Sequence, residues 1–85
     1  MFDKLKIQLD LQEWPSVYMF KFIVANEPEK IAQVSALFDD QANIRMLPSK
    51  NNKYMSLTAT ELMLSSGHVI ERYEKAAKFE GVIAL

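Results

Sequence analysis

The order of the predicted helices and strands is the feature that most limits how this chain of 85 residues can fold. The hydrophobic pattern predicts a strand, a helix, a strand, a tight turn, a strand, a helix and a final strand within residues 16–85. Two strand-helix-strand units that share one hairpin close into a single sheet, and right-handed connections place both helices on the same side. The order therefore predicts one α+β domain.

Residues 17–24 carry the clearest strand pattern, because two sets of side chains rich in aromatic and β-branched residues alternate along the segment. One face carries Tyr18, Phe20, Phe22 and Val24. The other face carries Val17, Met19, Lys21 and Ile23. We expect the aromatic face to point into the core, with Phe20 inside it, and the other face to lie open.

A helix is predicted to begin in the loop after this strand. Asn26 and Glu29 have the spacing of a capping box. Alternatively, Glu27 caps a helix that has Pro28 at its first position. An apolar stripe with three- and four-residue spacing follows, and we expect the helix to end at Asp39-Asp40. The stripe consists of Ile31, Val34, Leu37 and Phe38.

The middle of the chain is predicted to form a hairpin at the edge of the sheet. Residues 43–49 have the pattern of an edge strand, because Pro48 has no N–H to donate to a central ladder. Asparagines in the turn at residues 50–53 tolerate the left-handed backbone that a tight hairpin needs. The next strand, residues 54–62, has an apolar face and a face of mostly hydroxyl side chains.

A second helix and a short strand complete the chain. Ser65 or Ser66 is predicted to cap the helix, Gly81 to end it, and residues 82–85 to form the last strand. The result is the ferredoxin-like βαββαβ sandwich, in which a four-stranded antiparallel sheet carries two helices on one face. Its first and third strands are central, and its second and fourth strands lie at the edges.

Residues 1–15 are predicted to form an N-terminal arm before the single domain of residues 16–85. Apolar and polar residues alternate along the arm, as in a strand. Phe2, Leu5 and Leu9 would equally line one side of a short helix. The pattern leaves open whether the arm is helical or extended.

Composition argues against several classes of function. Ten Lys and Arg against eleven Asp and Glu give a formal net charge of −1, which supplies no long-range field for nucleic acid or anionic lipid. The chain has no cysteine for a disulfide, a nucleophile or a thiolate metal site. The apolar runs are short and flanked by charges, so we expect no signal peptide, no membrane span and a cytoplasmic location.

Three segments of the chain are similar to those of one bacterial family. They are Glu13-Trp14-Pro15 with the aromatic strand after it, the hairpin from Pro48 to Tyr54 with Ser56 and Thr58, and Glu80-Gly81-Val82-Ile83. Over roughly residues 13–85 the chain resembles the YbeD-like family of small proteins, whose function is not established. Members have the βαββαβ fold and are compared with ACT regulatory domains, which bind amino acids and pair through their sheets. The resemblance implies regulation and carries over no catalytic residue.

The loop after the first strand is the first candidate site, because several ferredoxin-like proteins place their chemistry beside this helix N-terminus. It has neither the paired cysteines of a metallochaperone nor the arginine and phosphate cradle of an acylphosphatase-like enzyme. By likeness to ACT domains, Asn26 with Glu27 or Glu29 would bind the ammonium group of an amino acid. Alternatively, Asn26 and Glu29 only cap the helix.

The open face of the sheet is the second candidate site. Its candidate interface residues are Val17, Met19, Ile23, Tyr54 and Thr58. Apolar residues there favour burial against a second copy, as a homodimer, or against another protein. Alternatively, the N-terminal arm covers them with Leu5, Leu9 and Leu11. An RNA-recognition motif shares this topology but stacks bases on aromatic side chains, and only Tyr54 is aromatic here, so nucleic acid is disfavoured.

The sequence predicts no catalytic residue, metal ligand or cofactor. His68 has no evident carboxylate or nucleophile partner, and one histidine with scattered carboxylates does not make a metal site. We therefore expect a non-enzymatic domain that acts by binding. The first hypothesis is a regulatory module of ACT type that senses a small metabolite, and the alternative is a protein-interaction adaptor that uses the open face.

Overall fold

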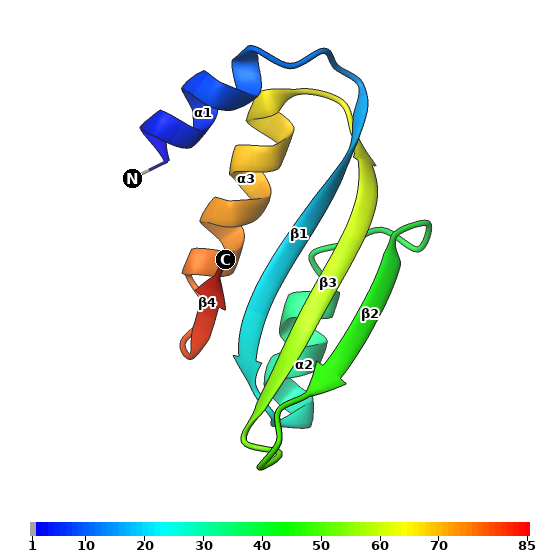
Figure 1. Cartoon of the computed structure of the whole chain (residues 1–85), viewed down its shortest axis with the longest axis vertical. Coiled ribbons are helices and arrows are strands. Elements are labelled where there is room, and N and C mark those ends of the chain that lie inside the picture. The colour runs from blue at the N-terminus through cyan, green and yellow to red at the C-terminus, as the bar shows by residue number, and fades with distance from the viewer. Residues whose placement is uncertain (1) are drawn as a thin grey trace.

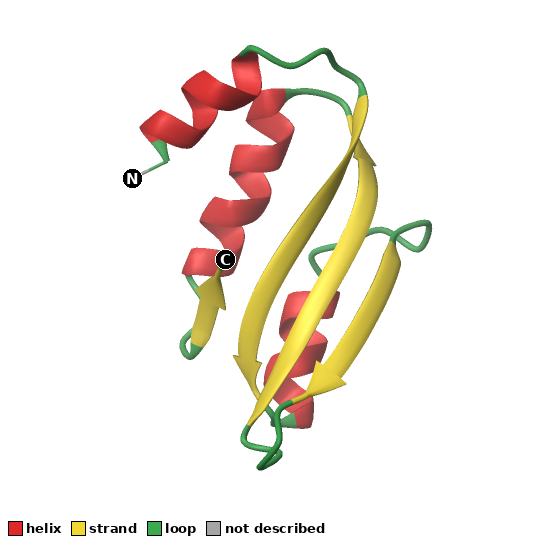
Figure 2. Cartoon of the chain, viewed as in Figure 1, coloured by secondary structure: helices red, strands yellow, loops and turns green. Residues whose placement is uncertain are grey.

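The computed structural model describes residues 2–85. In the described chain, helices and strands follow the order α1 (Asp3–Asp10), β1 (Ser16–Ala25), α2 (Pro28–Ser35), β2 (Asn43–Pro48), β3 (Tyr54–Met63), α3 (Ser66–Ala77) and β4 (Val82–Ala84) (Figure 1). Neighbouring strands are antiparallel, and the sheet order is β2-β3-β1-β4. Figure 2 shows the long strands β1 and β3 between the shorter β2 and β4. The predicted α+β class and the central and edge positions of the strands are confirmed.

The hydrophobic core lies between one face of the sheet and the helices α2 and α3. From the sheet, the fully buried side chains are Phe20, Phe22, Val24, Leu57, Ala59 and Met63. From the two helices, the buried apolar side chains are Val34, Val69, Ile70, Tyr73 and Ala76. All of them belong to one cluster, so α2 and α3 cover the same face of the sheet. The predicted inward face of the first strand is confirmed.

Helix α2 begins at Pro28, with Glu27 at its N-cap position, so the second prediction is confirmed for the start of the helix, although the Glu27 side chain makes no capping hydrogen bond. The predicted capping box of Asn26 and Glu29 is wrong, because the Asn26 side chain is hydrogen-bonded to the hairpin. Asn26 Nδ2 donates to the carbonyl of Asn52 at 2.9 Å, and the Asn26 N–H donates to the carbonyl of Lys53 at 2.9 Å. The loop after β1 is therefore tied to the β2-β3 turn.

The predicted end of this helix at Asp39-Asp40 is also wrong, because α2 ends at Ser35. Phe38 nevertheless reaches the core, from the turn that follows the helix. Its ring centroid lies 5.3 Å from that of Phe20. An apolar stripe can thus continue past the last helical residue when the following turn packs on the same core.

The hairpin between β2 and β3 is confirmed, and of its two asparagines Asn52 has the predicted role. Asn52 has a φ of 59°, the left-handed backbone that asparagine tolerates better than most residues. Asn51 Oδ1 accepts from the Lys53 N–H at 3.1 Å, and Ser49 Oγ accepts from the Tyr54 N–H at 3.1 Å. These side chains satisfy backbone donors that the turn leaves without ladder partners.

Ser65 caps α3, as one of the two predictions stated. Its Oγ accepts from the His68 N–H at 3.1 Å, while His68 Nδ1 accepts from the Leu64 N–H at 3.2 Å. This reciprocal pair resembles a capping box in which histidine replaces the usual glutamate. The helix ends at Ala77, before Gly81, whose φ of 80° turns the chain into β4.

The N-terminal segment is helical, and it adds a third helix to the two that were predicted. Leu9 of α1 is buried, and Leu5 and the preceding Phe2 pack against the core, so the helical spacing is the one that the fold uses. Trp14 Nε1 donates to the Leu9 carbonyl at 2.9 Å at the end of this helix.

Contacts with α3 determine where α1 lies. The Ser66 hydroxyl of α3 donates to the carboxylate of Asp10, which lowers the Asp10 pKa. Figure 1 shows α1 beside α3, on the helical side of the molecule. The alternative in which the arm covers the open face is therefore wrong, and Leu11 remains exposed.

Candidate functional site

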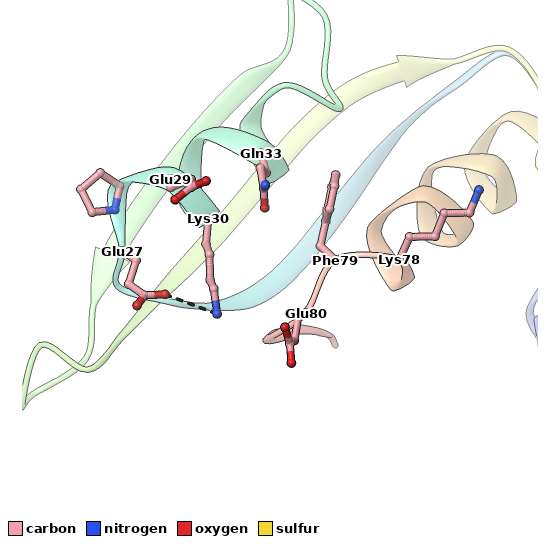
Figure 3. Close-up of a pocket in the computed structure, with 8 residues that line it drawn as sticks. Glu27, Glu29, Lys30, Gln33, Lys78, Phe79 and Glu80 are labelled. Carbon is pink, nitrogen blue, oxygen red and sulfur yellow. Dashed lines mark ion pairs between the residues drawn. The ribbon is translucent and has the colours of Figure 1, made fainter.

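The first candidate site surrounds the start of α2, where the loop after β1 meets the turn between α3 and β4 (Figure 3). A depression of about 580 Å³ is lined chiefly by Glu27, Glu29, Lys30, Lys78, Phe79 and Glu80. Of the predicted ligand residues, Glu27 and Glu29 line the depression, whereas the Asn26 side chain binds the hairpin.

The charges of this depression are mixed and partly neutralised. Lys30 Nζ lies 3.3 Å from Glu27 Oε2, and it would lie 3.1 Å from a Cβ at Gly81. Lys30 therefore extends from α2 towards the α3-β4 turn, where Gly81 leaves room for it. An exposed pair of this kind is worth at most about 1 kcal/mol, so little energy would be needed to replace it by a ligand.

The second candidate site is the open face, which we define as the outward-facing side chains of β1 to β4. Cross-strand pairing sets its rows. Lys21 and Arg45 flank Thr58, and Met19 lies beside Thr60 in the next row. A hollow of about 590 Å³ spans β1, β3 and β2 at these rows.

Large apolar side chains are exposed on the open face. They are Val17 (65%), Met19 (56%), Leu47 (71%), Tyr54 (50%), Leu62 (56%) and Ile83 (58%). Ile23 lies among them, opposite Ser56 and Ile83, and is half-buried. All five predicted interface residues therefore lie on this face, and neither α1 nor the other helices cover them.

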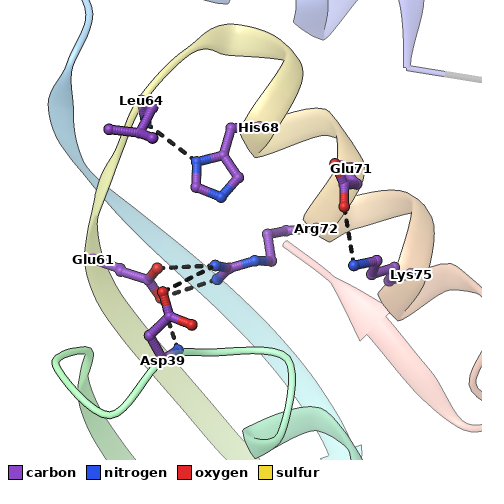
Figure 4. Close-up of polar contacts among 7 residues, drawn as sticks. All are labelled: Asp39, Glu61, Leu64, His68, Glu71, Arg72 and Lys75. Carbon is purple, nitrogen blue, oxygen red and sulfur yellow. Dashed lines mark hydrogen bonds and ion pairs between the residues drawn. The ribbon is translucent and has the colours of Figure 1, made fainter.

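The structure contains a buried ion pair between β3 and α3 that was not among the predicted sites (Figure 4). Arg72 Nη1 and Nη2 donate to Glu61 Oε1 and Oε2 at 3.0 and 2.9 Å, and both side chains are less than a tenth exposed. The guanidinium lies over the Phe38 ring, 5.2 Å from its centroid. The Asp39 N–H also donates to Glu61 Oε1, at 3.3 Å.

The sequence held a signal for this pair. Glu61 continues the two-residue alternation of Leu57 and Ala59 on the inward face of β3, and Arg72 falls within the apolar stripe of α3, three residues after Val69. Glu61 and Arg72 have opposite charges and both lie on faces that turn inward. This pattern predicts an ion pair between them, because burying either charge alone would be too costly.

The ion pair makes stability dependent on acidity. Hydrogen bonds from Arg72 lower the pKa of Glu61 below its ordinary value of 4.5. As the pH falls below about 4.5, the unfolded chain therefore takes up a proton at Glu61 before the folded chain does, and stability decreases. We expect the temperature midpoint of unfolding to decrease as the pH is lowered from 5 to 3, and to decrease less steeply in Glu61→Gln. Equal slopes in the two proteins would contradict the assignment to Glu61.

A second polar contact, which is partly buried, links β1 to α3. The hydroxyls of Tyr18 and Tyr73 lie 3.0 Å apart, and burial raises the pKa of Tyr73 far above its ordinary value. The Tyr73 hydroxyl therefore remains neutral at ordinary pH.

Metal-binding clusters and membrane-spanning helices are both absent from the part of the chain that the structure describes. Within residues 2–85, no cluster of three or more His, Asp or Glu side chains is arranged to hold a metal ion. No helix there has both the length and the apolar character needed to cross a membrane. The His68 ring is engaged in the cap of α3 through Nδ1.

Comparison with protein families assigns the chain. Residues 10–85 match the family described as "Protein of unknown function (DUF493)". The chain belongs to this family. The match runs from the end of α1 through β4, so it includes the open face, the first-loop depression and the buried ion pair. No curated protein and no solved structure matches the chain.

Proposed function

We propose that the chain is a non-catalytic binding module that holds another protein against the open face of its sheet. The supporting observation is the set of apolar side chains that this face exposes although three helices were available to cover it. Water contact with large apolar side chains is unfavourable by about 25 cal/mol per Å², and contiguous exposed patches commonly mark interaction sites.

The fold is consistent with such a role. We assign the sheet with α2 and α3 to the ferredoxin-like βαββαβ arrangement, with α1 as an addition, on the basis of the strand order β2-β3-β1-β4. In the split βαβ layout both helices cover one face, and the other face is left for partners. The resemblance to YbeD-like proteins, and through them to ACT domains, supports regulation as the purpose of the binding.

The test compares two neutral double variants of the whole chain. Met19→Gln with Leu47→Gln removes apolar surface from the open face. Ile7→Gln with Leu11→Gln removes similarly exposed residues from α1 and the residue after it. Substitutions at such exposed positions change stability by about 0.5 kcal/mol or less, so both variants should fold. We expect proteins retained from a cell lysate by the immobilised wild type to be retained by the second variant and lost by the first.

Two results would contradict this function. Equal retention by the two variants would mean that the open face is not the binding surface. Failure of the wild type to retain any protein above the level of a blank matrix would remove the support for a protein partner.

Small-molecule sensing at the first-loop depression is the second candidate. It is favoured by the carboxylates and the Lys30 ammonium that line the depression with Phe79, which together match the two charges of a free amino acid. An amino acid at about 100 times its Kd would add about 2.7 kcal/mol to the free energy of unfolding. Thermal unfolding against a panel of amino acids measures this, and Glu29→Gln should abolish the shift. A flat panel would leave the open face as the functional surface.

A further inference from the structure

We infer that the segment docked on the open face is an acidic amphipathic helix of another protein. This inference rests on the proposed function and names the chemistry of its partner. It follows from the charges on the face, from their positions, and from the shape and length of the apolar surface around them.

The charges on the open face have one sign. Its cations are Lys21 and Arg45, both exposed, and neither forms an ion pair with any residue in the described part of the chain. Among residues 2–85, no outward-facing strand position holds an Asp or Glu. Glu61, the carboxylate within the strands, points into the core.

The nearly neutral total charge conceals this arrangement. The chain has eleven Asp and Glu against ten Lys and Arg, but its carboxylates lie on helices, in loops or inside the core. The charged side chains of the face are therefore both positive, while the rest of the chain has eleven carboxylates against the eight remaining Lys and Arg. A partner that approaches the face meets a positive field, which favours an acidic segment and repels a basic one.

The two cations are placed to bind the same group. Lys21 of β1 and Arg45 of β2 both pair with Thr58 of β3, which lies between those strands. The three residues therefore occupy one row across β1, β3 and β2. Neighbouring strands are about 4.8 Å apart, which puts the two backbones about 10 Å from each other. A carboxylate above the Thr58 hydroxyl lies within reach of both long side chains, inside the hollow described above.

Apolar side chains lie on both sides of this row. Met19 precedes it and Ile23 follows it on β1, while Leu47 follows it on β2. Strands β1 and β3 each have 10 residues, which corresponds to about 34 Å of length. A helix of about 18 residues spans about 27 Å, and it can place one apolar stripe along the face with a Glu or Asp at its middle.

Two other occupants fit the face less well. A second copy packed face to face with its two-fold axis over this row would bring two sets of Lys21 and Arg45 together without a carboxylate between them. A single-stranded nucleic acid would need stacking platforms, and the face offers aliphatic side chains with Tyr54 as its aromatic residue. Both occupants are kept as outcomes of the test.

The experiment selects peptides from a displayed library of random 18-residue sequences against the whole immobilised chain. The bait proteins are the wild type, the charge reversal Lys21→Glu with Arg45→Glu, and the control Lys4→Glu with Lys75→Glu. The control changes the total charge equally, at exposed positions on α1 and α3 that line neither candidate site. Circular dichroism of each bait verifies folding, and the neutral pair Lys21→Gln with Arg45→Gln replaces the reversal if the latter does not fold.

We expect the wild type and the control to enrich peptides with helically spaced apolar residues and central Asp or Glu. The reversed bait should enrich Lys or Arg at the same places. A selected acidic peptide should bind the reversed or neutral variant at least about tenfold more weakly than the wild type, and added salt should weaken its binding to the wild type.

Several results would overturn the inference. They are enrichment of the same sequences by wild type and reversed bait, absence of an acidic bias, and failure to enrich any peptide.

Binding of a single-stranded RNA that requires Lys21 and Arg45 would assign the face to nucleic acid. A wild-type dimer that Met19→Gln with Leu47→Gln dissociates would assign it to a second copy. If the lysate experiment succeeds and the selection shows no acidic bias, only the partner's chemistry is wrong, whereas failure of both removes the docking function.

Discussion

Replacing Phe20 by alanine is expected to lower the free energy of unfolding by about 3–5 kcal/mol. The Phe20 side chain is fully buried. Its ring centroid lies 4.7 Å from that of Tyr18 and 5.3 Å from those of Phe38 and Tyr73. Truncation would therefore leave a cavity among aromatic rings contributed by β1, α3 and the turn after α2.

A domain of this size has a total stability on the order of 5–15 kcal/mol, so the variant should be close to unfolding at room temperature. Urea unfolding followed by circular dichroism measures the loss. Met19→Ala is the matched control, because Met19 is the preceding residue on the same strand and is 56% exposed. A loss below about 1 kcal/mol for Phe20→Ala, or a larger loss for Met19→Ala, would mean that the faces of β1 are reversed.

Replacing Arg72 by methionine is expected to cost about 3–5 kcal/mol, because it leaves the Glu61 carboxylate buried without its partner. Methionine keeps much of the apolar stem of Arg72 against Phe38, so the loss reports mainly on the charge. Lys75→Met is the matched control on the same helix. It breaks an exposed pair in which Lys75 Nζ lies 3.0 Å from Glu71 Oε1, and it should cost less than about 1 kcal/mol.

The double variant Glu61→Leu with Arg72→Met distinguishes the cost of an unpaired buried charge from the cost of lost packing. Removing both charges leaves apolar groups in an apolar site, so we expect it to recover most of the stability lost in Arg72→Met. The Asp39 N–H, which donates to Glu61 in the wild type, can turn to water because Asp39 is exposed. A double variant as unstable as Arg72→Met alone would mean that the loss comes from packing and not from an unpaired charge.

Much of the fold was predictable because its strands alternate and its turns use residues with special backbone preferences. Phe20 and Phe22 identified the buried face of β1, and Asn52 took the left-handed conformation expected in the hairpin. The errors arose where contacts between residues far apart in the sequence determine the local structure. The Asn26 side chain has an alternative partner at Asn52, and the position of α1 depends on its contact with Ser66.

The candidate sites were predictable to the level of which residues share a surface. The open face followed from alternation alone, so Val17, Met19 and Tyr54 were named correctly as its members. The row of Lys21, Thr58 and Arg45 required the register of three strands, which the sequence of each strand does not contain. The first-loop depression depends on Lys78 and Glu80, which approach the start of α2 only because the connection from β1 into α2 and the connection from α3 into β4 lie at the same end of the sheet.

The ion pair of Glu61 and Arg72 also limits how β3 can align with its neighbours. A slip of one residue would turn Glu61 towards solvent and Leu62 inward, leaving Arg72 without its partner beneath the sheet. The same slip would replace Thr58 between Lys21 and Arg45 by an apolar side chain that now faces the core. A contact hidden in the core thus fixes the order in which charges and apolar groups are displayed on the opposite side of the sheet.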